Sequence, residues 1–346
     1  MPVGQHTLRE IMSQPNVWVE ALAAFKPRDP LLQSWLETRA FDQVIVTGCG
    51  STYYLALTAA RLLRQAGCHA LACPASELLL HRKSVCLPGH HYLLLSVSRS
   101  GATSETVRAQ HHFKYYSRKP VLTVTCDSAS PLAIDANLAI AIDAAQEQSV
   151  AQTRSFSSML VVVQQLAALI AGYDLAASRP LPDMCRHLQE RYGDLARSLG
   201  ENRAISKFFF LGSDALYGIA CEAMLKMKEM SLAYSEAYHT LEFRHGPMSM
   251  VGKDSLVIGL ISSEGAKQEI RVLDEMADMG AKVLAIGQAH IENHEYVRLP
   301  ADMPAWCMPV LYLPVLQMLA FYRAILNGCD PDKPQNLSAV ISLDDI

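Results

Sequence analysis

The sequence predicts an α/β protein built from two tandem copies of one parallel-sheet unit, with helices on both faces of each sheet. Short apolar runs of strand length alternate with longer helical patterns along most of the 346 residues. The glycine turns that follow these runs recur at a constant distance: Gly48 and Gly212 are 164 residues apart, and so are Gly101 and Gly265. A repeat of this length indicates two hydrophobic cores, which suits a chain too long for one.

Strands separated by helical stretches imply right-handed crossovers in each copy. The strands expected in the first copy are 43–47, 69–73, 92–98, 120–125 and 138–142, and its helices are 53–66, 76–81 and 103–115. The second copy is expected to have strands 207–211, 256–262 and 282–287, and helices 215–232 and 266–279. Helical connectors are expected at 155–173 and 187–199.

Proline marks the two ends of this pattern. Pro15 is expected to break a helical arm that precedes the copies, and an apolar helix at 308–326 is expected to be broken near Pro314. The chain then divides into an arm, a first domain, a helical connector, a second domain and a tail, at 1–38, 39–175, 176–200, 201–329 and 330–346.

Composition excludes several classes of protein. The formal net charge is −4, the pI is near 6.3 and no basic run occurs, so neither a nucleic acid nor an anionic membrane is an expected partner. No stretch of 18 consecutive apolar residues and no secretory signal is present, and we expect a cytoplasmic protein. The nine cysteines form no C-x-x-C pair and no histidine pair has metal-ligand spacing, so we expect reduced cysteines, no metal and no other cofactor.

The segment from Ser96 to Glu105 is typical of a strand end, a hydroxyl-rich turn and a helix start. Short hydroxyl donors, unpaired backbone N–H groups and the positive end of a helix dipole suit a phosphate. The alternative is an ordinary capped turn, in which Glu105 closes a capping box. The repeat favours a phosphate site in the first copy only, because Glu264 of the second copy stands where the first has Ser100. The turn at 48–52 also follows a strand, so we expect both turns at one crevice.

The expected helix 215–232 carries three charged residues, Glu222, Lys226 and Glu229, at spacings that place them on one face. Most of its other positions are apolar, so the helix is expected to be buried. Charged side chains on a buried helix cost free energy and therefore call for an explanation. One interpretation is a solvated, ion-paired edge. The other is a partly buried Glu229 that takes a proton from carbon and returns it.

Two histidines follow in a polar and aromatic stretch. His245 precedes Gly246 and Pro247, a rigid turn that can aim its ring. His239 is the other candidate and has less to hold it. Either residue is also consistent with a structural histidine in a turn.

Taken in order, these motifs resemble the sugar isomerase (SIS) double-domain family, and within it the isomerase half of glucosamine-6-phosphate synthase. The matching segments are 10–15, 49–53, 98–103, 150–156, 225–229, 236–238, 241–247 and 330–337. The resemblance covers nearly the whole chain. It implies two tandem flavodoxin-like domains, each in three α/β/α layers, behind an N-terminal helical arm.

The resemblance also implies roles for individual residues. The phosphate of a sugar phosphate would be held by Thr52, Ser98, Ser100 and Thr103, with Ser51 near the sugar and Gln152 where the synthase has a phosphate-binding serine. Glu229 would shuttle the proton between C1 and C2, and His245 would assist ring opening. Supporting positions are Cys49, Gly50, Glu222 and Lys226.

Two departures from the synthase bear on function. The synthase carries an N-terminal glutaminase domain, whereas this chain begins Met1-Pro2 and enters the arm at once, so it is not expected to use glutamine. The tail lysine that forms an imine with the ketose in the synthase is matched by Ala339, and Lys333 is out of register.

What remains suits aldose–ketose proton transfer on a substrate that already carries nitrogen. The preferred hypothesis is an amino sugar 6-phosphate, isomerised and deaminated. The alternatives are a deglycase that cleaves a fructosamine 6-phosphate and a non-catalytic phosphosugar sensor. The apolar character of the arm and of 308–326 suggests more hydrophobic surface than two small sheets cover, which predicts at least a homodimer, and the resemblance places His245 near the subunit boundary.

Overall fold

The structure is a computed structural model and describes residues 3–38 and 40–337. The described chain forms two compact units. The first unit consists of Ser13–Glu147 and Arg154–Pro182. The second unit consists of Asp183–Leu337 together with the segments 3–12 and Gln148–Thr153.

The first unit is built on a five-stranded parallel sheet with the strand order β2-β1-β3-β4-β5. Its strands are β1 (Gln43–Gly48), β2 (His69–Pro74), β3 (Tyr92–Ser98), β4 (Val121–Thr125) and β5 (Leu138–Ala141). This order is that of flavodoxin-like folds, in which the chain reverses direction across the sheet between the first and third strands. Ligands in such folds bind at the carboxyl ends of the strands on either side of that point.

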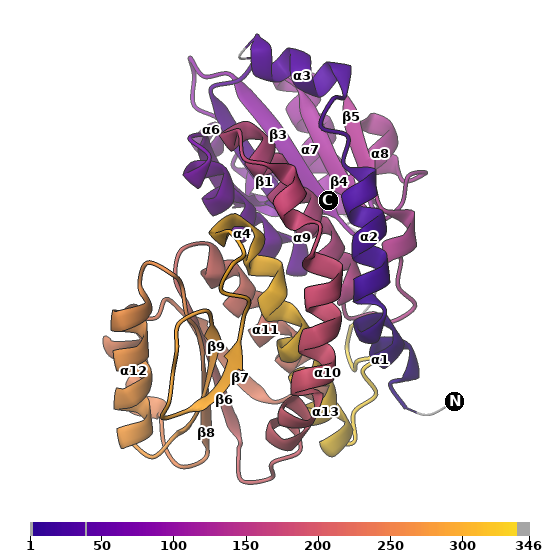
Figure 1. Cartoon of the computed structure of the whole chain (residues 1–346). Coiled ribbons are helices and arrows are strands. Elements are labelled where there is room, and N and C mark those ends of the chain that lie inside the picture. Colours follow the sequence, from indigo (N-terminus) through magenta and orange to yellow (C-terminus); the bar gives the residue numbers. More distant parts are fainter. Residues whose placement is uncertain (1–2, 39, 338–346) are drawn as a thin grey trace. The chain divides into compact units, whose positions relative to one another are not determined.

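Helices cover both faces of this sheet. They are α2 (Gln14–Ala24), α3 (Pro30–Glu37), α4 (Ser51–Gln65), α5 (Ala75–Leu80), α6 (Arg82–Val85), α7 (Ser104–Ser117), α8 (Pro131–Asp135) and α9 (Arg154–Ala171). On one face, Phe113 of α7 and Leu78 of α5 pack with Leu94 of β3 in a buried cluster. On the other, α4 and α9 pack together with α2 along α9 (Figure 1).

The second unit repeats the design with the strand order β10-β9-β8-β6-β7, again all parallel. Its strands are β6 (Lys207–Gly212), β7 (Tyr234–Tyr238), β8 (Ser255–Leu260), β9 (Lys282–Gly287) and β10 (Glu295–Arg298). Its helices are α1 (Gln5–Met12), most of α10 (Leu181–Gly200), α11 (Ala215–Ser231), α12 (Ala266–Asp278) and α13 (Leu313–Leu326). Numbered from β6, this is the strand order of the first sheet, so the predicted fold class of two tandem α/β copies is confirmed.

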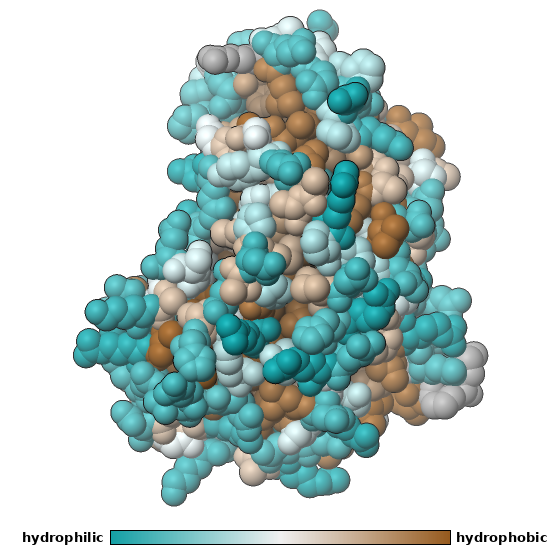
Figure 2. All heavy atoms as spheres, viewed as in Figure 1, coloured by the Kyte–Doolittle hydropathy of each residue, from teal (hydrophilic) through white to brown (hydrophobic). Residues whose placement is uncertain are grey.

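The second sheet is also covered on both faces. Val272, Leu273 and Met276 of α12 are buried against it, while the outer side of α12 is hydrophilic (Figure 2). α11 contacts β6 and β7 and packs along α13 (Figure 1). Each unit therefore has three layers, helices, sheet and helices.

Both ends of the described chain meet in the second unit. Carboxylate oxygens of Asp332 accept hydrogen bonds from the backbone N–H groups of His6 and Thr7, at 3.0 and 2.7 Å. Glu10 of α1 accepts a hydrogen bond from the backbone N–H of Gln148 at 2.6 Å. The arm therefore anchors both the tail and the segment Gln148–Thr153.

Several elements of the fold were not predicted. They are the edge strands β7 and β10 and the short helices α3, α6 and α8. Both strands carry half-exposed side chains, which weaken the apolar signal. The break expected near Pro314 is present: Pro309–Tyr312 is a 3₁₀ turn, and α13 begins at Leu313 with Pro314 in its first turn, where proline costs no hydrogen bond. Pro15 separates α1 from α2 as expected.

Two helices among the described residues are long and apolar enough to cross a membrane, α9 and the stretch Pro309–Leu326. They are 78% and 83% buried inside the protein, as core helices are. The expectation that 308–326 leaves apolar surface uncovered is therefore wrong, because the protein's own chain covers most of it.

Candidate functional site

Two strand-to-helix turns meet at the carboxyl edge of the first sheet. The turn after β1 contains Cys49, and the turn after β3 leads into α7, which carries Thr106. The Cys49 Sγ lies 3.3 Å from the Thr106 Oγ1. The expected convergence of these turns is thus present, at the point of the sheet where flavodoxin-like folds bind ligands.

The turn after β3 is held by its own hydroxyl groups. Ser98 Oγ accepts a hydrogen bond from the backbone N–H of Gly101 at 3.1 Å, and Ser100 Oγ accepts one from Ala102 at 3.2 Å. Gly101 has φ +58°, and a Cβ there would lie 2.0 Å from the Ser130 Oγ, so only glycine fits. Thr103 is the N-cap residue of α7 but makes no side-chain capping bond, which leaves its hydroxyl beside the helix N-terminus.

The turn after β1 uses its hydroxyl differently. Thr52 Oγ1 donates a hydrogen bond to the Cys49 carbonyl and accepts one from the Cys49 N–H, both at 2.9 Å. Ser51 and Thr52 are 4% and 3% exposed, and Gly50, with φ +55°, precedes α4. Thr52 therefore stabilises the turn, and the assignment of Ser51 and Thr52 as phosphosugar contacts stays a prediction.

Cys49 is not placed to act as a nucleophile. Burial raises the pKa of its thiol, and the nearby Glu105 carboxylate raises it further. A thiol with a raised pKa is neutral at physiological pH. Its role is to pack the two turns together.

The corresponding turn of the second copy already holds an anion. Ser262 Oγ accepts a hydrogen bond from the Gly265 N–H at 3.0 Å, which repeats the first copy. Here, however, the Glu269 carboxylate accepts bonds from the N–H and the hydroxyl of Ser262, at 2.7 and 3.0 Å. Glu269 is 2% exposed. A buried carboxylate of the chain itself is a poor neighbour for phosphate, in keeping with a phosphate site in the first copy only.

The three charged residues of α11 form one buried cluster in the second unit. The Lys226 Nζ lies 2.5 Å from the Glu229 Oε2 and 3.4 Å from the Glu222 Oε1. The side chains of Lys226 and Glu222 are 1% and 0% exposed, whereas that of Glu229 is 19% exposed. The interpretation as a solvated edge is therefore wrong: one buried ammonium joins two carboxylates, and only Glu229 reaches solvent.

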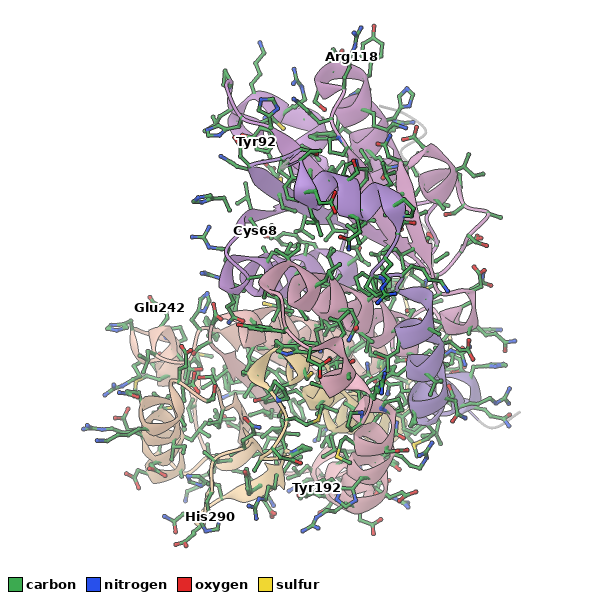
Figure 3. All side chains as sticks on the ribbon, turned by 45° about the horizontal axis from the view of Figure 1, so that its top comes forward. Cys68, Tyr92, Arg118, Tyr192, Glu242 and His290 are labelled. Carbon is green, nitrogen blue, oxygen red and sulfur yellow. The ribbon has the colours of Figure 1, made fainter. Side chains whose placement is uncertain are left out.

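The two candidate histidines lie on one exposed segment of the second unit, after β7. His245 ends the 3₁₀ turn Glu242–Arg244 and precedes Gly246 at φ +123°. Its ring forms no hydrogen bond, ion pair or ring contact with the other described residues, and Figure 3 shows Glu242 of the same turn at the periphery of the unit. The His239 ring, in contrast, stacks on Tyr217 with 3.8 Å between ring centroids. The expectation that His239 has less to hold it is wrong.

Gln152 lies in the segment Gln148–Thr153 of the second unit, whereas the hydroxyl residues belong to the first. Its side-chain Oε1 is buried and has no hydrogen-bond partner among the described residues. The segment itself is fixed, because Gln317 of α13 donates a hydrogen bond to the Thr153 carbonyl at 3.1 Å. A buried amide oxygen without a partner suits a ligand contact. Ala339 lies outside the described residues.

Arg99 lies between two hydroxyl residues of the β3 turn and has a structural role that its sequence position does not reveal. Its Nη1 lies 3.6 Å from the Glu147 Oε2, and the side chains are 10% and 0% exposed. Glu147 also accepts a hydrogen bond from the backbone N–H of Ser155, at the start of α9. This buried ion pair ties the turn to α9. Its only signal in the sequence is a charged residue in an otherwise uncharged turn.

The described residues include no group of three or more His, Cys, Asp or Glu side chains that could hold a metal ion. The first unit offers hydroxyl donors beside a helix N-terminus, and the second unit offers an ion-paired carboxylate that reaches solvent.

Comparison with known proteins identifies the class of protein. The SIS domain family matches residues 39–169 and 203–326, and the chain belongs to this family. Within it, 97% of the chain aligns with the isomerase region of glutamine–fructose-6-phosphate aminotransferases. The relative from Pyrococcus horikoshii is 26% identical over 352 residues, and the chain spans 57% of its length.

Two solved structures share the fold over nearly their whole length. A glucosamine-6-phosphate deaminase from Thermotoga maritima is 29% identical, with a TM-score of 0.78 over 97% of this chain and 99% of that one. A tagatose-6-phosphate ketose/aldose isomerase from Escherichia coli is 24% identical, with a TM-score of 0.86 over 99% and 97%.

We predict that the Arg99–Glu147 pair is needed for stability. Arg99→Met leaves a buried carboxylate without its cation and should lower the free energy of unfolding by about 3–5 kcal/mol. Replacing both residues, as Arg99→Met with Glu147→Leu, should cost less than the sum of the single changes. Urea unfolding measures both effects.

The matched control is Arg186→Met, which breaks an ion pair with Asp183 whose side chains are 47% and 75% exposed. It should change stability by less than about 1 kcal/mol. Equal losses for Arg99→Met and Arg186→Met would contradict the prediction.

Proposed function

We propose that this chain is a phosphosugar isomerase that isomerises and deaminates an amino sugar 6-phosphate such as glucosamine 6-phosphate. The observation that carries the proposal is the buried ammonium of Lys226, which pairs with Glu229 at 2.5 Å while leaving that carboxylate partly open to solvent. A base held in place in this way can move a proton on a bound sugar. The family membership and the hydroxyl-lined turn support the choice of substrate class.

In the proposed reaction, Glu229 takes the proton from C2 of the open-chain aldose and returns it to C1. The electrons of the C2–H bond pass through an enolamine as the C1 carbonyl oxygen gains a proton and becomes a hydroxyl. The C2 amine nitrogen loses one proton, and the product carries an imine at C2. Water hydrolyses this imine to fructose 6-phosphate and ammonia, so atoms and charge balance. Lys226 and Glu222 position Glu229, and His245 assists ring opening.

The phosphate is held by the first unit in this proposal. Ser98, Ser100 and Thr103 offer hydroxyl groups at the N-terminus of α7, whose dipole favours an anion. Ser51 and Thr52 contribute from the start of α4. No cofactor is required, because the substrate's own nitrogen forms the imine.

A nitrogen-bearing substrate is preferred because Ala339 stands where the synthase has its imine-forming lysine. The likeness to the Thermotoga maritima deaminase, at 29% identity, supports the same choice. Fructosamine 6-phosphate deglycation, which releases glucose 6-phosphate and an amine, is the second candidate because it needs the same proton transfer. A sugar phosphate is charged and is retained by membranes, so we also propose a cytoplasmic location.

A substrate panel tests the proposal. Glucosamine 6-phosphate, a lysine-derived fructosamine 6-phosphate and tagatose 6-phosphate are incubated with the protein, and ammonia, free amine and hexose phosphates are measured. We expect ammonia and fructose 6-phosphate from the first compound. Release of lysine alone favours the deglycase, and binding without turnover of any compound favours the sensor.

A pair of variants separates binding from chemistry. Glu229→Gln should retain affinity for the sugar phosphate but lower turnover by roughly 10² to 10⁴, the usual contribution of a general acid–base. Ser100→Ala should instead weaken binding by about 1–3 kcal/mol, because it removes a hydrogen bond to a charged group. Calorimetric titration and steady-state kinetics read the two effects. Full activity of Glu229→Gln would contradict the role of Glu229 as the general acid–base. Unchanged affinity of Ser100→Ala would contradict the role of Ser100 in phosphate binding.

We further propose that the working unit is at least a homodimer, with His245 near the subunit boundary. The segment around His245 is exposed and carries Leu241 and Met250, which are 47% and 48% exposed. Exposed apolar side chains beside a functional residue are typical of an association surface. The family resemblance supports a histidine that reaches the partner subunit's site.

Subunit mixing tests this arrangement. Inactive Glu229→Gln and inactive His245→Ala protomers, unfolded and refolded together, should regain part of the wild-type activity, since some mixed dimers contain one intact composite site. Each variant refolded alone is the control. A site built within one subunit predicts no recovery, and a monomeric mass in solution contradicts the proposal directly.

A further inference from the structure

A pocket of about 320 Å³ opens in the first unit away from the β1 and β3 turns. It lies at the opposite edge of the sheet, where α7 ends and β4 begins, and α3 covers one side of it. Leu31 and Trp35 of α3 line the pocket with apolar side chains, and Lys114, Arg118 and Lys119 line it with cationic ones. The volume is at the lower end of the range for small-molecule sites.

The three cations of the pocket differ in their partners. Lys114 Nζ lies 3.1 Å from a carboxylate oxygen of Asp135, and Lys119 Nζ lies 2.6 Å from His91 Nδ1. The guanidinium of Arg118 forms no ion pair or hydrogen bond with the described residues, and the residue is exposed. Of the three cations, only Lys114 is paired with a carboxylate, so the pocket keeps an excess of positive charge.

Cations at the C-terminal end of α7 also offset the helix dipole, which explains a lysine in its last turn. The dipole favours Arg118 as well, but its backbone conformation is unusual for an arginine. This residue ends the helix in the left-handed conformation, with φ +52° and ψ +32°, where glycine is favoured and a side chain is strained. Figure 3 shows Arg118 at the outer end of its unit, and apolar residues gather below α3 in Figure 2.

We propose that this pocket binds a small organic anion, a carboxylate or phosphate ester whose apolar part rests on Leu31 and Trp35 while its charge pairs with Arg118. Asn137, which also lines the pocket, accepts a backbone hydrogen bond from Val121 through its side-chain oxygen at 2.9 Å. That bond orients the amide so that its NH₂ group is a further donor. The site is separate from the residues proposed for turnover.

The test uses two fluorinated probes, 3-(4-fluorophenyl)propanoate and 4-fluorophenyl phosphate, with the neutral amide of the first as a matched control. Binding to the wild-type protein is followed by ¹⁹F NMR. The two anions should bind and the amide should not. Arg118→Gly should weaken both anions by about tenfold or more, the factor for one charge-assisted hydrogen bond.

Control variants separate binding from folding and from net charge. Arg118→Gly and Leu232→Gly both relieve a left-handed residue at a helix end, at φ +52° and +55°, so both should raise the melting temperature by a few degrees. Only Arg118→Gly should lose the probe. Lys83→Ser removes an exposed cation of the same unit and should leave probe binding unchanged.

Ser100→Ala identifies any phosphate probe that sits in the β3 turn instead, because it weakens binding there alone. The proposal is overturned if neither anion binds at millimolar concentration, if the amide binds as well as the propanoate, or if Arg118→Gly leaves affinity unchanged.

Discussion

The buried ammonium of Lys226 is the interaction on which the arrangement of the second unit depends. A lysine that is 1% exposed is tolerable only if carboxylates compensate its charge, and Glu222 and Glu229 do so from one face of α11. The charge of Lys226 is compensated because all three side chains lie on one continuous helix, α11. This helix packs between the second sheet and α13. Because the helix is fixed on both sides, Glu229 is held where it alone of the three reaches solvent.

The two copies show how one backbone was adapted to two tasks. Gly50 and Asp214, 164 residues apart, have nearly the same angles, φ 55° and ψ −124° against φ 49° and ψ −123°. An aspartate in this region carries strain of about 1–3 kcal/mol, which the surrounding fold must offset. The second copy thus keeps the backbone conformation of this turn although aspartate replaces the glycine. In the turn that follows β8, the Glu269 carboxylate accepts the hydrogen bonds of the Ser262 N–H and hydroxyl.

The sequence was sufficient for the parts of this protein that repeat or that bury apolar runs. Spacing alone predicted two parallel sheets, and glycine and hydroxyl residues such as Gly101 and Ser98 marked the turns that follow their strands. The edge strands of the second sheet, β7 and β10, escaped, because they carry half-exposed polar and aromatic side chains, whereas the more apolar edge strands β2 and β5 of the first sheet were predicted. Long-range pairing escaped as well: nothing local joins Arg99 to Glu147, or Tyr217 to His239, since such contacts exist only once the sheet has formed.

The same limit explains why the sequence indicates the residue types of the candidate site but not the hydrogen bonds that each side chain makes. Residue types near a strand end indicate phosphate chemistry, but they do not say which hydroxyl is already used. The Thr52 hydroxyl forms two hydrogen bonds with the Cys49 backbone, whereas Thr103 makes no side-chain capping bond. Of two residues with the same side chain, the one whose oxygen is not committed to the turn is the better ligand, because binding then costs no existing hydrogen bond. The hydroxyl groups of the first unit therefore divide into those that stabilise a turn, such as that of Thr52, and those that make no capping bond, such as that of Thr103.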